Sequence, residues 1–302
     1  VPKGKLDCLI VKDISQRIRD LFTSKLGSVI VNSSDTIVIS AFLGLTMLAV
    51  YQNYFYIITA VTGFVAIIFQ SCTAGIGNSV IVETEEKNYG DLNKFTFLIS
   101  WLAGFCVCCM FCLYQPFMKI WVGEDLMLGI SAVICFCIYY FVYEINQLLN
   151  TYKDAAGIWH EDRFRPLITA LTNLVLNLIT VQFWGIYGVI LSTVISTLFV
   201  GIPWLLHNLF TVLFSKKHLR TYLRKLASYC IVVSISCVLC AFICSFVAFS
   251  DWGTLIVRAV ICCIVPNTIY FVAYHKTIEF KQSIQLIDKM TKGKLHLGRH
   301  FL

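Results

Sequence analysis

Three ionisable side chains interrupt otherwise apolar stretches of this sequence, and they are the first places to look for chemistry: Asp35, Glu144 and Arg258. A charged side chain inside a membrane is costly and usually faces a cavity or a partner. Asp35 is therefore predicted to line a cavity or couple to an ion. For Glu144 a hydrated cavity mouth and a working carboxylate are both open, and Arg258 could instead snorkel to a nearby surface.

Polar side chains recur on one helical face in the first two apolar stretches. Lys25, Asn32 and Asp35 fall at three- and four-residue steps, and Gln52 and Tyr56 repeat the pattern in the second stretch. Small and polar residues also let membrane helices pack closely, which is the competing interpretation. We predict a substrate or ion cavity lined by Lys25, Asn32, Asp35, Gln52, Tyr56, Glu144 and Arg258.

A charged loop over residues 154–165 supplies candidate cytoplasmic gate residues: Asp154, Asp162, Arg163 and Arg165. His160 and Glu161 do not form the metal-binding His-Glu-x-x-His motif, because Arg163 and Phe164 follow them. Adjacent charges in a short loop are typical of a solvated salt-bridge cluster. Neither a catalytic set nor a metal or cofactor site is predicted.

The elements that must position these residues are membrane-spanning helices. The chain has 302 residues, 58% of them apolar and 14% charged, with a mean hydropathy of +0.77. Apolar stretches near the twenty residues that cross a bilayer recur along it. The sequence predicts an all-α integral membrane protein with about eight spans: 24–43, 47–78, 92–116, 127–150, 165–182, 186–212, 221–248 and 252–274.

The basic residues support this count. When loops are assigned to alternate sides, all of the 24 lysines and arginines except Lys119 and Arg258 fall on one side. That side is predicted to be cytoplasmic, with both ends of the chain there. Its basic segments would attract anionic membrane lipids, so the charge of +7 requires no nucleic-acid partner.

Thirteen of the fourteen cysteines lie in apolar runs. Cys109 and Cys112 have a metal-like spacing, but the sequence shows no second pair or polar surroundings beside them. Free cysteine commonly acts as a small hydrophobic side chain. The sequence therefore favours a structural role for these thiols.

The predicted organisation is an amphipathic cytoplasmic linker over 1–21, a six-helix transmembrane lobe over 22–212, two further helices over 213–275 and a basic cytoplasmic tail over 276–302. The first stretch is loop-like and charged, with neither an initial Met nor a leader pattern. We expect the sequence to begin inside a longer protein.

Two stretches resemble bacterial polysaccharide and O-antigen repeat-unit flippases. One is Asn32-Ser-Ser-Asp35-Thr-Ile-Val-Ile-Ser40-Ala-Phe-Leu-Gly44 with Tyr51-Gln-Asn-Tyr54. The other is Asp154-Ala-Ala-Gly157-Ile-Trp159-His-Glu-Asp162-Arg163-Phe-Arg165-Pro166, followed by Gly185-Ile-Tyr-Gly188. The resemblance covers about residues 21–208 and is specific only in combination.

This resemblance implies the second lobe of a MATE-like transporter of the multidrug/oligosaccharidyl-lipid/polysaccharide exporter superfamily, with two added helices. The implied protein lies in the bacterial cell membrane. The implied cargo is undecaprenyl-pyrophosphate-linked oligosaccharide, moved by alternating access alongside polysaccharide polymerase machinery. A missing N-terminal lobe or a second copy would complete the cavity and supply most of the phosphate contacts. The alternatives are a multidrug/cation antiporter, a membrane glycan-modifying enzyme and a structural bundle.

Overall fold

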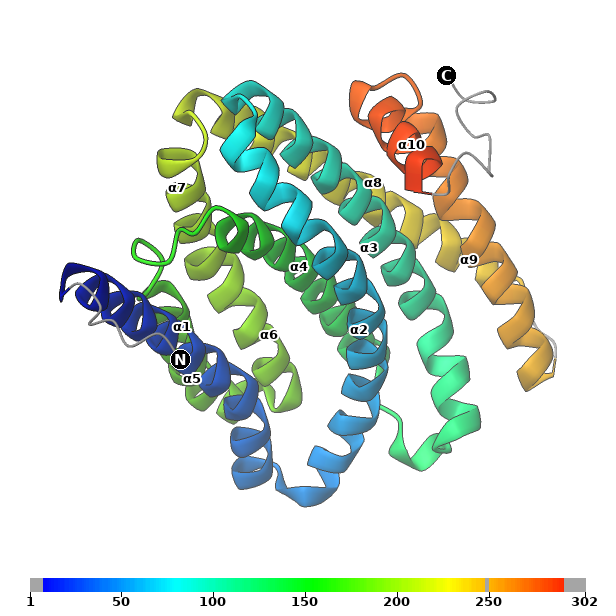
Figure 1. Cartoon of the computed structure of the whole chain (residues 1–302). Helices are drawn as coiled ribbons and strands as arrows, with labels where there is room; N and C mark the ends of the chain where they lie inside the picture. The colour runs from blue at the N-terminus through cyan, green and yellow to red at the C-terminus, as the bar shows by residue number, and fades with distance from the viewer. Residues whose placement is uncertain (1–7, 248–249, 291–302) are drawn as a thin grey trace, which may run out of the picture.

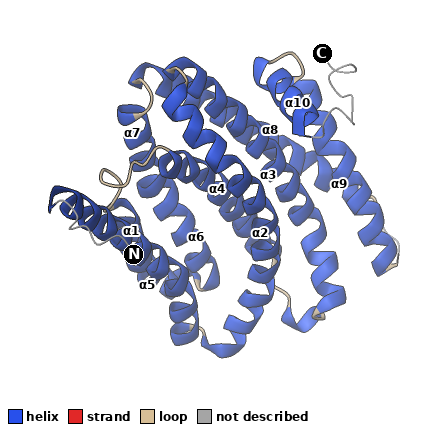
Figure 2. Cartoon of the chain, in the orientation of Figure 1, coloured by secondary structure: helices blue, strands red, loops and turns tan. Residues whose placement is uncertain are grey.

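A computed structural model describes residues 8–247 and 250–290, and every regular element in these ranges is helical (Figures 1 and 2). The longer helices are α1 (Cys8–Phe42), α2 (Gly44–Val82), α3 (Glu85–Trp121), α4 (Ile130–Ala155), α5 (Arg165–Trp184), α6 (Ile186–Ser196), α7 (Ile202–Val212), α8 (Leu219–Ser245), α9 (Asp251–Tyr274) and α10 (Ile278–Met290). Two short 3₁₀ turns, η1 (Glu124–Leu126) and η3 (Lys216–His218), and the π-helical turn η2 (Thr197–Gly201) complete the set.

Seven segments of the described chain are long and apolar enough to cross a membrane, with α6, η2 and α7 forming one of them. The predicted all-α integral membrane fold of about eight helices is confirmed. The segment predicted first, 24–43, is not among the seven. The charged and polar residues of α1 lower its hydropathy. Within the bundle, Asp35 is hydrogen-bonded by Asn177 of α5 and does not depend on solvation by lipid.

Helix α1 nevertheless covers the full length of α5. Gly27 lies against Pro166, Asp35 bonds to Asn177, and Leu43 lies near Gly185, so the two helices run parallel in register. Helix α5 is one of the seven apolar segments. The part of α1 from Gly27 onward therefore lies at the same depth in the bundle as a candidate span.

The connections alternate between two ends of the bundle. Figure 1 shows the α2–α3 and α9–α10 connections at the upper end, whereas α1–α2 and α3–α4 turn at the lower end. Lys119 lies near the lower turn and pairs there with Glu124 at 3.0 Å. The α2–α3 and α9–α10 connections, near Lys87 and Lys276, thus lie at the end opposite Lys119 (Figure 1), in agreement with the charge pattern.

Both ends of the described chain are more regular than expected. The predicted loop-like linker is wrong from Cys8 onward, because α1 runs without a break from Cys8 into the first predicted span. The start of the basic tail forms α10, whose Phe280 packs on Phe97 and Trp101 of α3. Burial of this aromatic side chain explains why the segment orders as a helix.

Gly188 lies where α5 and α6 approach each other closely. A Cβ atom there would lie 2.5 Å from the backbone oxygen of Thr180 on α5. Backbone cannot move aside as a side-chain tip can, so Gly188→Ala is expected to lower the free energy of unfolding by about 1–3 kcal/mol. The measurement is the thermal unfolding midpoint in lipid nanodiscs.

Gly63→Ala is the matched control, because nothing lies within 4 Å of a Cβ at this position of α2. Alanine favours a helix over glycine by about 0.8–1.0 kcal/mol, so this variant should be neutral or slightly more stable. Equal midpoints for Gly188→Ala and the wild type would contradict the close approach of α5 and α6.

Candidate functional site

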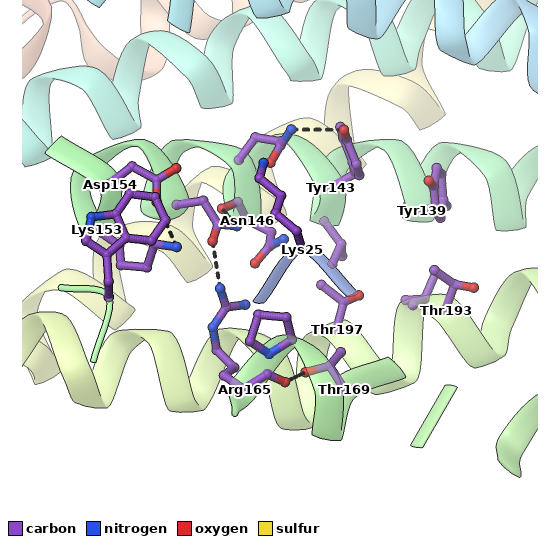
Figure 3. A pocket seen from close by; sticks show the side chains of 16 residues that line it. Lys25, Tyr139, Tyr143, Asn146, Lys153, Asp154, Arg165, Thr169, Thr193 and Thr197 are labelled. Carbon is purple, nitrogen blue, oxygen red and sulfur yellow. Dashed lines mark hydrogen bonds and ion pairs between the residues drawn. The ribbon is translucent and has the colours of Figure 1, made fainter. Parts of the chain in front are cut away.

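A polar cavity of about 320 Å³ opens among α1, α4, α5 and α6. Figure 3 shows its lining, with Lys25 of α1 facing the polar side of α4. The α4 residues lie at helical steps on one face, which explains why one helix supplies so much of the wall. The polar lining residues are Lys25, Tyr139, Tyr143, Asn146, Gln147, Asn150, Lys153, Asp154, Arg165, Thr169, Thr193 and Thr197.

One end of the cavity is closed by a buried ion cluster. The Arg165 guanidinium donates to both carboxylate oxygens of Asp162, at 2.6 and 2.8 Å, and also to Asn150 Oδ1 at 2.7 Å. Lys153 Nζ lies 2.7 Å from Asp154 and 3.5 Å from Asp162. Bidentate pairing fixes both the orientation of the Arg165 guanidinium and its distance from Asp162, so this cluster is more rigid than the charged side chains of a solvated loop.

The α4–α5 connection folds to bring these charges together. Gly157 adopts φ +69°, which lets the chain reverse directly after α4. Trp159 then covers the Lys153 ammonium, 4.4 Å from its ring centroid. Pro166 begins α5 at a position where the missing N–H costs nothing. Asp162 is 1% exposed, so the expectation of a solvated cluster is wrong for this carboxylate.

Asp35 is held by a polar network that spans three helices. Asn177 Nδ2 of α5 donates to its Oδ1 at 2.7 Å, and Thr193 Oγ1 of α6 donates to its Oδ2 at 3.0 Å. Asn173 donates to the Thr193 oxygen at 2.9 Å and accepts from Ser34 at 2.7 Å. Thr193 also lines the cavity, so the network connects Asp35 to the cavity wall.

A π-helical turn interrupts the α6–α7 span beside the cavity, at Thr197–Gly201. Thr197 itself lines the cavity, and Pro203 follows in the first turn of α7. Such turns release one backbone hydrogen bond and occur frequently at functional sites.

The predicted cavity residues divide into two groups. Lys25 lines the cavity and Asp35 reaches it through Thr193. Gln52 and Tyr56 are exposed on α2 outside it, although Gln52 donates to Thr36 at 3.4 Å, next to Asp35. Asn32 lies on α1, but its side chain is outside the described residues.

Glu144 and Arg258 were predicted for this cavity and lie elsewhere. Glu144 points away from the wall formed by Tyr143 and Gln147, toward α2 and α3, with Tyr140 and Thr62 as near neighbours. Arg258 lies on α9 beside cysteines of α3 and α8. The sequence predicts which helix and which helical face carry a residue, but only packing decides which neighbouring helix that face contacts.

Of the predicted gate residues, the structure brings Asp154, Asp162 and Arg165 together and separates Arg163. Arg163 turns to the first half of α1, with its Nη1 3.7 Å from Asp20 Oδ1. His160 Nδ1 joins the same carboxylate at 3.0 Å. The loop therefore fastens to α1 on one side and closes the cavity on the other.

Several site residues were not among those predicted: Asn150, Lys153, Trp159, Asn173, Asn177, Thr193 and Asn208. The polar steps of the fifth span contain Asn173 and Asn177, so their spacing was the available signal. Lys153 resembles any basic loop residue in sequence, yet it is 4% exposed. Only the folded loop reveals that burial.

Neither a protein-family model, a curated protein nor a solved structure matches this chain. The site's own chemistry is a polar, partly cationic cavity with a buried carboxylate network, set among helices that suit a membrane.

Glu144 is 1% exposed, and neither carboxylate oxygen has a well-formed hydrogen bond among residues 8–247 and 250–290, although the Tyr140 and Thr62 side chains lie near it. An unsatisfied buried polar group costs about 1–3 kcal/mol, so Glu144→Met is expected to raise the free energy of unfolding by a similar amount. The thermal unfolding midpoints of the wild type and Glu144→Met measure this difference in stability. Glu144→Gln, which keeps polar atoms in place, should gain less, and a loss of stability in Glu144→Met would contradict the assignment.

Proposed function

We propose that this chain is the cavity-bearing half of a flippase that moves lipid-linked oligosaccharide across the bacterial cell membrane. The observation that carries the proposal is a polar cavity among membrane-type helices whose lining includes the cations Lys25, Lys153 and Arg165. The diphosphate of an undecaprenyl-pyrophosphate-linked sugar is an anion, and its glycan requires polar partners. The cations of the lining suit the diphosphate, and its polar side chains suit the glycan.

Lys25 is the cation best placed to contact a headgroup. Its side chain is exposed and forms no ion pair within the described part of the chain. Lys153 and Arg165 are already matched by Asp154 and Asp162. They would therefore shape the end of the cavity, while Lys25 supplies attraction for phosphate.

The exposed faces of α1 and α2 support a two-part transporter. Gln52, Thr59 and Gln70 of α2 are exposed although α2 is one of the seven apolar segments. Polar side chains on a membrane helix usually face a protein partner or a water-filled route. A preceding lobe or a second copy of the chain would cover this face and complete the route.

Asp35 is the candidate coupling carboxylate. Its two oxygens accept hydrogen bonds from α5 and α6, so a change in its charge would alter the contacts among α1, α5 and α6 together. Alternating access requires such a link between an ion and helix packing. The same geometry favours the second candidate, a multidrug/cation antiporter, in which Asp35 would bind the cation directly.

The test uses the full reading frame in its native cell. Deletion should cause undecaprenyl-pyrophosphate-linked oligosaccharide to accumulate on the cytoplasmic leaflet, measured by mass spectrometry and by enzymatic labelling of membrane vesicles. Lys25→Glu should fail to restore flipping, whereas Lys87→Glu, at an exposed i,i+4 pair on α3, should restore it. Unchanged lipid-linked sugar together with loss of drug or cation efflux would replace the flippase by the antiporter.

A further inference from the structure

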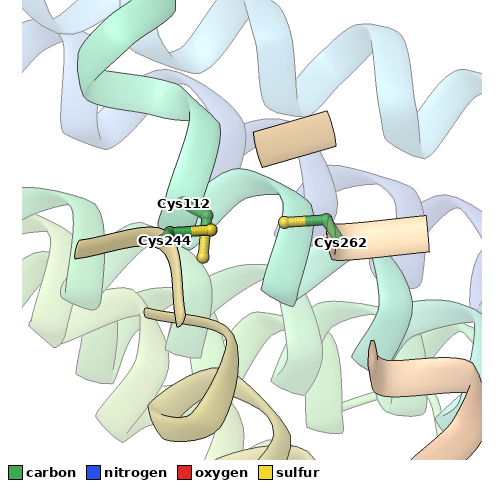
Figure 4. A group of neighbouring side chains, drawn as sticks. All are labelled: Cys112, Cys244 and Cys262. Carbon is green, nitrogen blue, oxygen red and sulfur yellow. The ribbon is translucent and has the colours of Figure 1, made fainter. Parts of the chain in front are cut away.

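A cluster of thiols lies away from the cavity, where α3, α8 and α9 pack together. Cys112 of α3, Cys244 of α8 and Cys262 of α9 have their sulfur atoms within 4.8 Å of one another. Figure 4 shows Cys262 pointing toward the other two from the opposite side of the junction. All three are buried, and further thiols, Cys108 and Cys240, line the same core.

The sequence pattern missed this arrangement because each helix contributes part of it. Cys108 and Cys112 lie four residues apart on one face of α3, and Cys240 and Cys244 do the same on α8. The spacing of Cys109 and Cys112 lacks a second pair along the chain, yet packing supplies partners from α8 and α9. Packing therefore brings together three sulfurs that the sequence keeps on separate helices.

The sulfur geometry fits a three-coordinate metal ion. Metal–thiolate bonds are about 2.3 Å long, so three sulfurs around one ion lie about 4 Å apart. The observed separations, at most 4.8 Å, need a contraction of about 1 Å or less, within reach of side-chain rotation. Thiolate ligands select soft ions such as Cu(I) and Zn(II). Three sulfurs lie mutually within 4.8 Å, which matches a three-coordinate ion better than the four ligands that structural Zn(II) almost always takes.

Arg258 supplies an independent observation that points to negative charge at this junction. It lies one helical turn before Cys262, and its charge acts on the thiols of Cys112 and Cys244. Its Nε is buried and meets no hydrogen-bond partner in the described ranges. Arg258 is partly buried as a whole, and a guanidinium in a membrane helix favours a nearby counter-charge, which neutral thiols do not provide.

We propose that Cys112, Cys244 and Cys262 form a Cu(I) site, with Arg258 as its counter-charge. Two thiolates and one thiol around Cu(I) carry one net negative charge, which the guanidinium offsets. Binding releases two protons from the thiols, and no electron is transferred. Cys244 lies in the last turn of α8, so the ion would enter near the α8–α9 connection.

The experiment titrates the full chain in lipid nanodiscs with Cu(I) under anaerobic, reducing conditions, against the chelator bathocuproine disulfonate. One Cu(I) per chain is expected, and X-ray absorption should show a shell of three sulfurs. Cys112→Ser, Cys244→Ser and Cys262→Ser should each weaken binding by more than roughly 10-fold, the least that loss of an outer partner usually causes. Arg258→Met should weaken it by about 10–100-fold.

Cys263→Ser is the matched control, because Cys263 is exposed and adjacent to Cys262 on α9. It should bind Cu(I) as the wild type does. Size-exclusion profiles and thermal midpoints identify any variant that fails to fold, and Arg258→Met tests the site with all thiols present. Equal affinity in the wild type and the three serine variants, a nitrogen or oxygen shell, or uptake of Zn(II) with none of Cu(I) would overturn the proposal.

Discussion

Replacing Asp162 by alanine is expected to lower the free energy of unfolding by about 3–5 kcal/mol, the usual cost of breaking a buried ion pair from one side. The carboxylate receives two hydrogen bonds from Arg165 and one from Asn208, at 3.1 Å, and lies 3.5 Å from Lys153. Its loss leaves two buried cations beside one another. Reversible unfolding in lipid nanodiscs, followed by tryptophan fluorescence, measures the change.

Arg163→Ala is the control for this prediction, since Arg163 is the neighbouring charge and is only partly buried, with its Nη1 3.7 Å from Asp20. Asp20 is buried but keeps His160 at 3.0 Å, so this variant should lose clearly less stability than Asp162→Ala. A double variant, Asp162→Leu with Arg165→Met, should recover part of the lost stability because it removes both charges. Similar destabilisation by Asp162→Ala and Arg163→Ala would contradict the buried cluster.

Replacing Asp35 by asparagine is expected to reduce transport by about tenfold or more, since a hydrogen bond to a charged group is worth about 1.5–3 kcal/mol. The amide keeps the size of the side chain but removes its charge. In the wild type, Asn177 and Thr193 each donate a hydrogen bond to one Asp35 oxygen. The amide nitrogen of asparagine would replace one of these oxygens and would face a donor instead of accepting from it. Initial rates of substrate movement in vesicles measure the effect.

The stability of Asp35→Asn should be measured beside its transport rate, because loss of folding would also abolish flipping. Asp125→Asn is the control: it makes the same chemical change in the exposed α3–α4 turn and should leave transport unchanged. Asp35→Glu keeps the charge and should retain more activity than Asp35→Asn. Full transport by a folded Asp35→Asn protein would exclude Asp35 as the coupling group.

The two polar networks differ in how far the sequence could foresee them. Asp35 belongs to a series of polar residues at helical steps on α1, and Asn173 and Asn177 stand four residues apart on α5. Local periodicity therefore predicts a polar face on each helix. The burial of Lys153 and Asp162 does not follow, because it depends on how the α4–α5 connection folds over Trp159. A lysine in a charged loop looks solvated until its tertiary neighbours are known.

The sequence alone determined the helical membrane class and the approximate positions of the predicted spans, because span length and charge bias are properties of short, contiguous stretches. It did not determine the early start of α1 or the presence of α10. Tertiary structure decided the partners: it moved Glu144 and Arg258 away from the cavity, joined Asp35 to Thr193, and collected cysteines from three helices. The physical reason is that the rotation of each helix about its own axis is set by its neighbours. Periodicity shows that residues share one helical face, but only packing between distant helices sets which side chains that face meets.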